Sequence, residues 1–160
     1  MKLKQGSTLF LRGVIALIGV IVLAVLVLMP QLEGRAADLD LFHIYADPLI
    51  LYTFIGSIPF FVALYQGFKL LGFIDNNQVF SQPSVNVVKN IRNCALIFSG
   101  FILLGILYIR FSVVGEDPAG VTAVSIFITF ASIVVATAAA VFQRLLQNAV
   151  DIKSENELTV

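Results

Sequence analysis

The chain has 160 residues, of which 59% are hydrophobic and 12% are charged, and its formal net charge is zero. So apolar a composition is unsuited to a water-solvated surface and indicates an integral membrane protein. Because the zero net charge provides no basic field, we expect no direct nucleic-acid binding.

The first predicted element is the charge-free run from Gly13 to Leu32, which follows Lys2, Lys4 and Arg12. This run is longer than a typical signal-peptide core, and no A-x-A-like cleavage site follows it directly. We therefore predict a retained first transmembrane helix.

Three more charge-free runs follow, at 48–68, 93–109 and 118–143. Each can cross a hydrocarbon core of roughly 30 Å as a helix, if the arginines beside the third run snorkel to the interface. None alternates apolar and polar residues as a membrane β-strand does. We predict an all-α integral membrane protein in which residues 1–160 form one four-transmembrane-helix bundle. The expected spans are about 9–31, 48–69, 85–111 and 118–148.

Inside the second predicted helix, Gly56 and Pro59 form a candidate helix kink. Proline removes one backbone hydrogen bond and crowds the preceding turn. A hinge or a broken-helix ion site is one interpretation. An ordinary kink repacked against neighbouring helices is favoured, because glycine and proline are common in membrane helices.

The segment Ser81-Gln82-Pro83 is typical of a helix start, with a capping hydroxyl before a proline in the first turn. Val85, Val88 and Ile91 then recur at a spacing close to one helix face. We expect this stretch to continue into the third span as one long helix.

The fourth predicted helix carries small residues, with Ser125 and Thr129 expected on one face and Ser132, Ala136 and Ala140 on another. Small faces let membrane helices approach closely. Packing within one chain is the favoured interpretation, and a homo-oligomer contact is the alternative.

An apolar stripe follows the fourth span, so this helix is expected to continue for one or two turns before 154–156.

Lysine and arginine are unevenly distributed between the predicted loops. Eight lie in the N-terminal segment, the middle loop and the C-terminal tail: Lys2, Lys4, Arg12, Lys69, Lys89, Arg92, Arg144 and Lys153. Only Arg35 and Arg110 lie in the other two loops. The positive-inside rule therefore predicts that both termini are cytoplasmic, in a multi-pass protein of the inner cell membrane.

No predicted span has an ionisable residue in its interior, which argues against a proton or ion pump. His43 could be drawn with Asp38, Asp40 and Asp47 as a metal site, but a solvated acidic loop is favoured. Cys94 has no nearby base and is interpreted as a packing residue. We predict no catalytic, cofactor-binding or metal-binding residues and no enzymatic activity.

Two segments carry a resemblance: Val79–Arg92, which contains Phe-Ser followed by Asn-Val-Val-Lys, and the tail Glu155–Val160. They resemble the Phe-Ser-x-x-Asn-Val-Lys-x-Leu-Arg loop and the Glu-Asn-Asp-Leu-Thr-Ile ending of the YoaS-like family. That family comprises small bacterial four-helix integral membrane proteins and is a domain-of-unknown-function family. The resemblance implies a similar fold.

Members of the YoaS-like family are often encoded beside a small helix-turn-helix regulator. The resemblance therefore suggests a membrane-bound partner or sensor for such a cytoplasmic DNA-binding regulator. The alternative is an uncharged-pore channel or transporter-like conduit formed by oligomerisation. The candidate partner-contact residues are Phe80, Ser81, Asn86, Lys89, Arg92, Glu155, Asn156, Leu158, Thr159 and Val160.

Overall fold

The computed structural model describes residues 2–32, 48–112 and 119–158, and within them the side chains of 6–28, 48–111 and 120–156. These residues form four α-helices joined, where the connection is described, by one short turn. The helices are α1 (Lys2–Leu32), α3 (Pro48–Asp75), α4 (Gln82–Ser112) and α5 (Ala119–Leu158). All four are long and apolar enough to cross a membrane, so the predicted all-α architecture with four candidate spans is confirmed.

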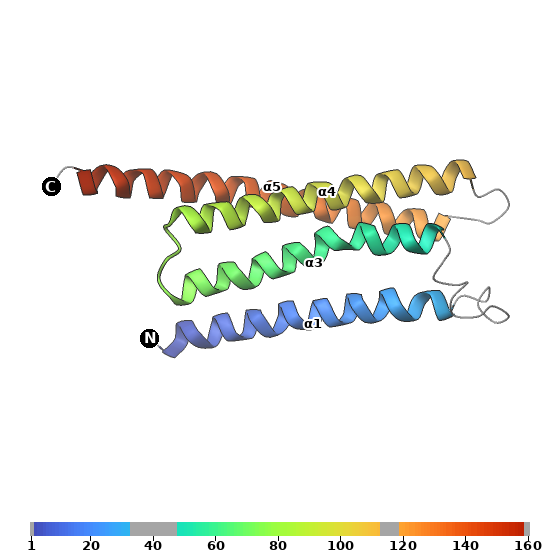
Figure 1. Cartoon of the computed structure of the whole chain (residues 1–160), viewed down its shortest axis with the longest axis horizontal. Coiled ribbons are helices and arrows are strands. Elements are labelled where there is room, and N and C mark those ends of the chain that lie inside the picture. The colour runs from blue at the N-terminus through green and yellow to red at the C-terminus, as the bar shows by residue number, and fades with distance from the viewer. Residues whose placement is uncertain (1, 33–47, 113–118, 159–160) are drawn as a thin grey trace.

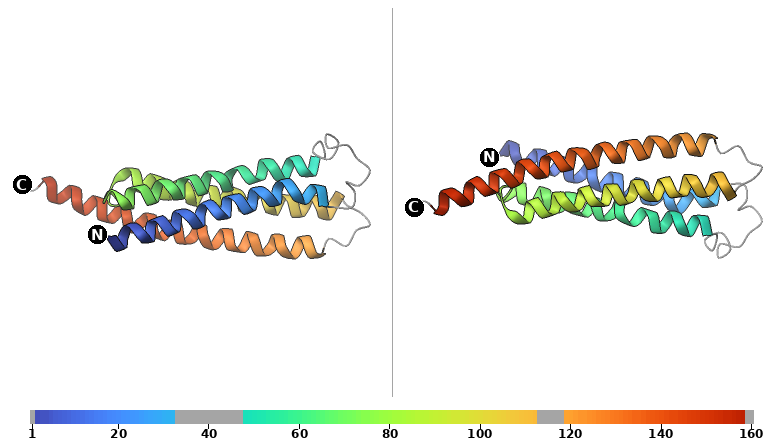
Figure 2. Two further views of the ribbon diagram at one scale, coloured as in Figure 1. Left: turned by 90° about the horizontal axis from the view of Figure 1, so that it is seen from below. Right: turned by 90° about the horizontal axis from the view of Figure 1, so that it is seen from above.

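The helices run antiparallel in sequence order, and each packs chiefly on its neighbour along the chain: α1 on α3, α3 on α4, and α4 on α5 (Figures 1 and 2). The start of α1, the α3–α4 turn and the end of α5 lie at one end of the bundle. We call residues 70–92 and 143–158, which gather there, the turn end. The opposite ends of the four helices form the loop end.

The α3–α4 turn is built by a left-handed residue at the helix terminus. Asn77 has a φ of 54°. The Gln78 N–H donates to the Phe73 carbonyl (2.8 Å) and the Asn77 N–H to the Ile74 carbonyl (3.2 Å). These are the two bonds of a Schellman motif, in which asparagine is tolerated at the left-handed position. They end α3 and reverse the chain toward α4.

The predicted start of α4 is confirmed, since this helix begins at Gln82 with Pro83 in its first turn. The Ser81 hydroxyl does not take the expected capping role: it donates to the Gln78 carbonyl (2.6 Å), and the Ser81 backbone carbonyl accepts from the Ser84 N–H (3.0 Å). From Gln82 the helix continues without a break to Ser112. The expectation of one long helix is therefore also confirmed.

The predicted end of α5 is wrong, because the helix continues through 154–156 to Leu158. Its 40 residues correspond to about 60 Å, twice the roughly 30 Å of a hydrocarbon core. Figure 1 shows the last part of α5 extending past the α3–α4 turn. Lysine, serine and glutamate are polar but do not break a helix as glycine or proline would.

The small residues of α5 form one face, and the prediction of two faces is wrong. Thr129 and Ala136 are buried, and Ser125, Ser132 and Ala140 are half-buried, while most positions between them are exposed. Neighbouring members of this stripe are three or four residues apart, so they stay on one side of a helix with 3.6 residues per turn. The stripe faces α4 of the same chain, which leaves its centre covered without a second copy.

Helix α3 continues through Gly56 and Pro59 from Pro48 to Asp75. Gly56 is buried, and a Cβ atom placed on it would lie 3.6 Å from the Phe101 ring of α4. The Ser57 hydroxyl donates to the Phe54 carbonyl (2.7 Å), within α3. The glycine thus brings α3 close to α4, and the kink at this point stays a prediction.

Candidate functional site

A belt of basic side chains marks the level at which the charge-free part of the bundle begins. It comprises Arg12, Lys69, Lys89, Arg92 and Arg144. Lys69 and Lys89 are six and seven residues from the helix ends at Asp75 and Gln82, so they lie at similar depths on antiparallel helices. We call these five residues the cationic belt.

Two contacts place the other helices near this level. Arg12 Nη2 lies 2.7 Å from Asp75 Oδ2, six residues beyond Lys69 on α3. Arg92 Nη1 donates to Gln143 Oε1 on α5 at 3.0 Å, which places the adjacent Arg144 at this depth. From the belt toward the loop end, the described part of each helix is uncharged until Arg110.

The least exposed hydrophobic side chains of the described structure lie at the turn end. Val85, Val88 and Leu146 are each about 2% exposed, and they form the buried cluster of the described chain. Four partly buried side chains surround it: Leu70, Val79, Ala139 and Val150. These residues come from α3, the turn, α4 and α5, so three helices meet in one small core, which we call the turn-end core.

Ser84 is fully buried beside this core, and its hydroxyl is satisfied by backbone carbonyls. It donates to the Ser81 carbonyl at 2.8 Å and to the Val79 carbonyl. Buried polar groups are tolerated when they are hydrogen-bonded in this way. Ser84 therefore holds the turn against the first turn of α4.

Polar side chains connect α4 to α5 around the core. Arg92 donates to Gln143 on α5 and to the neighbouring Asn93 (3.1 Å). Nearer the turn, Gln82 Nε2 donates to Gln147 Oε1 (3.3 Å), and Gln147 Nε2 donates to Asp151 Oδ1 (2.8 Å). The two helices thus stay registered beyond the belt, where α5 leaves the rest of the bundle.

The contact between Arg12 and Asp75 joins α1 to the other helices, and sequence reasoning missed it. The two residues are 63 positions apart, and no local pattern pairs them. A Cβ atom on Gly72 would lie 4.0 Å from Arg12 Nη2, so the arginine crosses α3 where no side chain stands in the way. Within the described part of the chain, Arg12 Nε and Gln66 Oε1 are buried without a hydrogen-bond partner.

The candidate partner-contact residues fall into an exposed set and a packed set. Phe80, Asn86, Lys89, Glu155 and Asn156 are exposed.

Ser81 and Arg92 are half-buried, and their side chains bond to Gln78 and to Gln143. Leu158 ends α5, its side chain is outside the described set, and Thr159 and Val160 lie outside the described residues. All described candidates lie at the turn end.

Six serine and threonine hydroxyls inside the spans bond to their own helices. Each donates to a backbone carbonyl three or four positions earlier: Thr53 to Leu49, Ser57 to Phe54, Ser99 to Leu96, Thr129 to Ser125, Ser132 to Ile128 and Thr137 to Ile133. This is the ordinary behaviour of serine and threonine in membrane helices. These hydroxyls do not form a polar path through the described bundle.

Metal-binding groups do not gather in the described residues, where no three His, Cys, Asp or Glu side chains lie together. His43 and the three aspartates drawn with it lie outside the described residues. Cys94 is a half-buried free cysteine.

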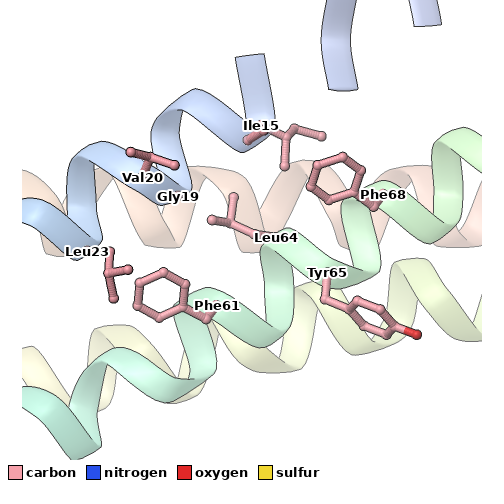
Figure 3. A pocket seen from close by; sticks show the side chains of 9 residues that line it. Ile15, Gly19, Val20, Leu23, Phe61, Leu64, Tyr65 and Phe68 are labelled. Atoms are coloured by element: carbon pink, nitrogen blue, oxygen red, sulfur yellow. The ribbon is translucent and has the colours of Figure 1, made fainter. Parts of the chain in front are cut away.

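One apolar groove, of about 350 Å³, lies between α1 and α3 (Figure 3). Its walls are aliphatic and aromatic: Ile15, Ala16, Gly19, Val20 and Leu23 of α1, and Phe61, Leu64, Tyr65 and Phe68 of α3. Figure 3 shows Ile15 and Phe68 at one end of the groove and Leu23 and Phe61 at the other.

Comparison with known proteins shows the family to which this sequence is similar. Residues 34–160, which include α3, α4 and α5, match the family described as "Protein of unknown function (DUF2975)". The "Uncharacterized membrane protein YoaS" of Bacillus subtilis (strain 168) is 42% identical over 160 residues, covering 99% of this chain and 100% of that relative. No solved structure matches. The predicted resemblance is confirmed, and the chain belongs to the DUF2975 family, with a membrane protein as its relative.

Proposed function

We propose that this protein is a membrane-embedded docking partner for a cytoplasmic protein, and that the turn end is its cytoplasmic face. The distribution of lysine and arginine supports this orientation, since eight of ten lie on the turn-end side of the chain. In this topology both termini are cytoplasmic and the protein is resident in the inner membrane of a bacterium. The protein acts by binding and carries out no catalysis.

The observation that carries the proposal is the position of the turn-end core. Val85, Val88 and Leu146 are the least exposed hydrophobic side chains of the described chain, at about 2% each, and they lie at or beyond the cationic belt. Helices in lipid gain little from burying apolar surface, whereas helices that emerge into water gain about 25 cal/mol per Å² buried. A core at this level therefore supports a folded head outside the hydrocarbon, with a defined surface.

That head presents groups suited to protein recognition. Phe80 is 58% exposed at the tip of the turn, and Asn86 and Lys89 are exposed on the first turns of α4. A large aromatic side chain surrounded by polar groups is typical of a binding hot spot. We assign the partner as a small helix-turn-helix regulator, following the resemblance to the YoaS-like family.

The experiment is co-purification of the full chain, extracted from membranes, with a small cytoplasmic helix-turn-helix regulator of the same bacterium. We expect enrichment over an unrelated four-helix membrane protein, and loss of most of that enrichment in Phe80→Ala. Phe111→Ala is the matched control, because Phe111 is 81% exposed at the loop end. Equal loss in both variants, or no enrichment of the regulator at all, would contradict the proposal.

The conduit alternative gains no support from the described bundle. Six of its serine and threonine hydroxyls bond to their own helices, and its groove is lined by apolar side chains. Flux through liposomes that contain the protein would support a conduit if substitution of Gly56 or Pro59 reduced it.

A further inference from the structure

We propose that the groove between α1 and α3 is a phospholipid site, in which Arg12 and Lys69 recognise the phosphate of an anionic lipid and the groove holds one of its acyl chains. This inference concerns a ligand and a face of the bundle that the proposed docking function does not use.

The groove lies along the part of α1 that faces α3. It extends from Ile15 to Leu23, eight helical steps or about 12 Å. Its floor is closed where a Cβ on Gly19 would lie only 3.3 Å from Leu64 Cδ1. Because its walls lie within the charge-free part of both helices, the groove is at hydrocarbon depth and excludes polar ligands.

Two members of the cationic belt stand at one end of this groove. Arg12 is one helical turn before Ala16 on the same face of α1, and Lys69 is one turn after Tyr65 on α3. Lys69 is exposed and makes no hydrogen bond or ion pair within the described part of the chain. In the proposed site a phosphate bridges these two cations while its acyl chain enters the groove.

An anionic phospholipid matches both parts of the site, the apolar groove and the two cations. Basic pockets between transmembrane helices bind anionic headgroups, and each basic residue near an anionic surface contributes about 1 kcal/mol. An uncharged headgroup would use the groove but not the cations. A free phosphate would use the cations but not the groove.

Asp75 competes with the anion for Arg12. Its replacement is therefore a test, because a competing role and a purely structural role predict opposite changes in lipid retention. Its carboxylate lies 2.7 Å from Arg12 Nη2 and competes with a phosphate for the guanidinium. Removing the negative charge with Asp75→Asn should therefore increase retention of an anionic lipid. Loss of retention would follow instead if Asp75 served only to hold α1 in place.

The experiment reconstitutes the full chain in nanodiscs of equal phosphatidylglycerol and phosphatidylcholine, and counts retained lipids by native mass spectrometry. We expect one retained phosphatidylglycerol per chain in preference to phosphatidylcholine. Lys69→Gln should reduce that preference about fivefold, the ratio equivalent to one basic residue. Arg144→Gln, which removes a belt cation on α5, should leave it unchanged.

The groove itself is tested by filling it. Ala16→Phe places a ring in the groove and should abolish retention, whereas Leu17→Phe adds a ring at a neighbouring exposed position outside it and should not. Added glycerol 3-phosphate, which has no acyl chain, should fail to displace the lipid. Equal retention of both lipids, equal effects of the two phenylalanines, or displacement by glycerol 3-phosphate would each overturn the proposal.

Discussion

Ser84 shows at the scale of one residue how the α3–α4 turn is held. Its hydroxyl is fully buried and shares its single proton between two carbonyls of the turn. Ser84→Ala removes both bonds, so we expect the free energy of unfolding in detergent to fall by about 1–3 kcal/mol. Ser132→Ala is the control, because its hydroxyl only supplements a helical carbonyl. Equal thermal stability of Ser84→Ala and the native chain would contradict this account.

Gly105 of α4, like Gly56 of α3, lets these two helices approach closely. Tyr52 donates its hydroxyl to the Phe101 carbonyl at 2.6 Å, and a Cβ on Gly105 would lie 3.2 Å from Tyr52 Cε1. Gly105→Val adds further methyl groups at this contact and should destabilise the bundle by about 1–3 kcal/mol through overpacking. Thermal unfolding in detergent measures this.

Gly100 provides the matched control on the same helix, since a Cβ there meets nothing within 4 Å. Gly100→Val should therefore leave the unfolding temperature nearly unchanged. If both valine variants unfold at the same temperature, Gly105 is not a close-packing position.

At the scale of one helix, α5 combines a buried stripe with a lipid-facing or water-facing surface. Leu146 is 2% exposed in the turn-end core, whereas its neighbour Leu145 is 60% exposed. Leu146→Ala should reduce the free energy of unfolding by about 2–5 kcal/mol, because a cavity remains among Val85 and Val88. Leu145→Ala should change it by no more than about 0.5 kcal/mol. Denaturation in detergent distinguishes the pair, and similar losses would contradict the observed register.

Local signals predicted the helices well and their packing less well. Charge-free runs located all four, and a serine followed by Gln82 and Pro83 located the start of α4. The end of α5 was missed because the polar tail contains no helix breaker. Its small residues lie on one face because steps of three and four residues rotate in opposite senses about a helix with 3.6 residues per turn and largely cancel.

The sequence predicted where the candidate site lies but not which of its side chains pair between helices. Phe80 and Asn86 are exposed at the turn end, as a contact surface requires. Arg92 had the same expected role, yet it is half-buried and bonds to Gln143, 51 residues away. Such pairings depend on how antiparallel helices are registered, and a single sequence carries no local signal for that.

At the scale of the whole molecule, the ion pair between Arg12 and Asp75 joins α1 to the region that matches the family, and the cationic belt gives the bundle one charged rim. Among the described residues, Arg110 is the only lysine or arginine at the loop end. This asymmetry is the physical basis for orientation, because lysine and arginine near the ends of membrane helices are retained in the cytoplasm.

We therefore predict that a green fluorescent protein fused after Val160 will fluoresce in bacterial cells, and that alkaline phosphatase at the same position will be inactive. The fluorescent protein folds well in the cytoplasm, whereas the phosphatase requires the oxidising periplasm for its disulfides. Replacing Lys69, Lys89, Arg92 and Arg144 together by glutamine should weaken the preference for this orientation and yield a mixed population, because these four are half of the eight lysines and arginines of the proposed cytoplasmic segments. Phosphatase activity from the unmodified chain would place the turn end outside and reverse the proposed topology.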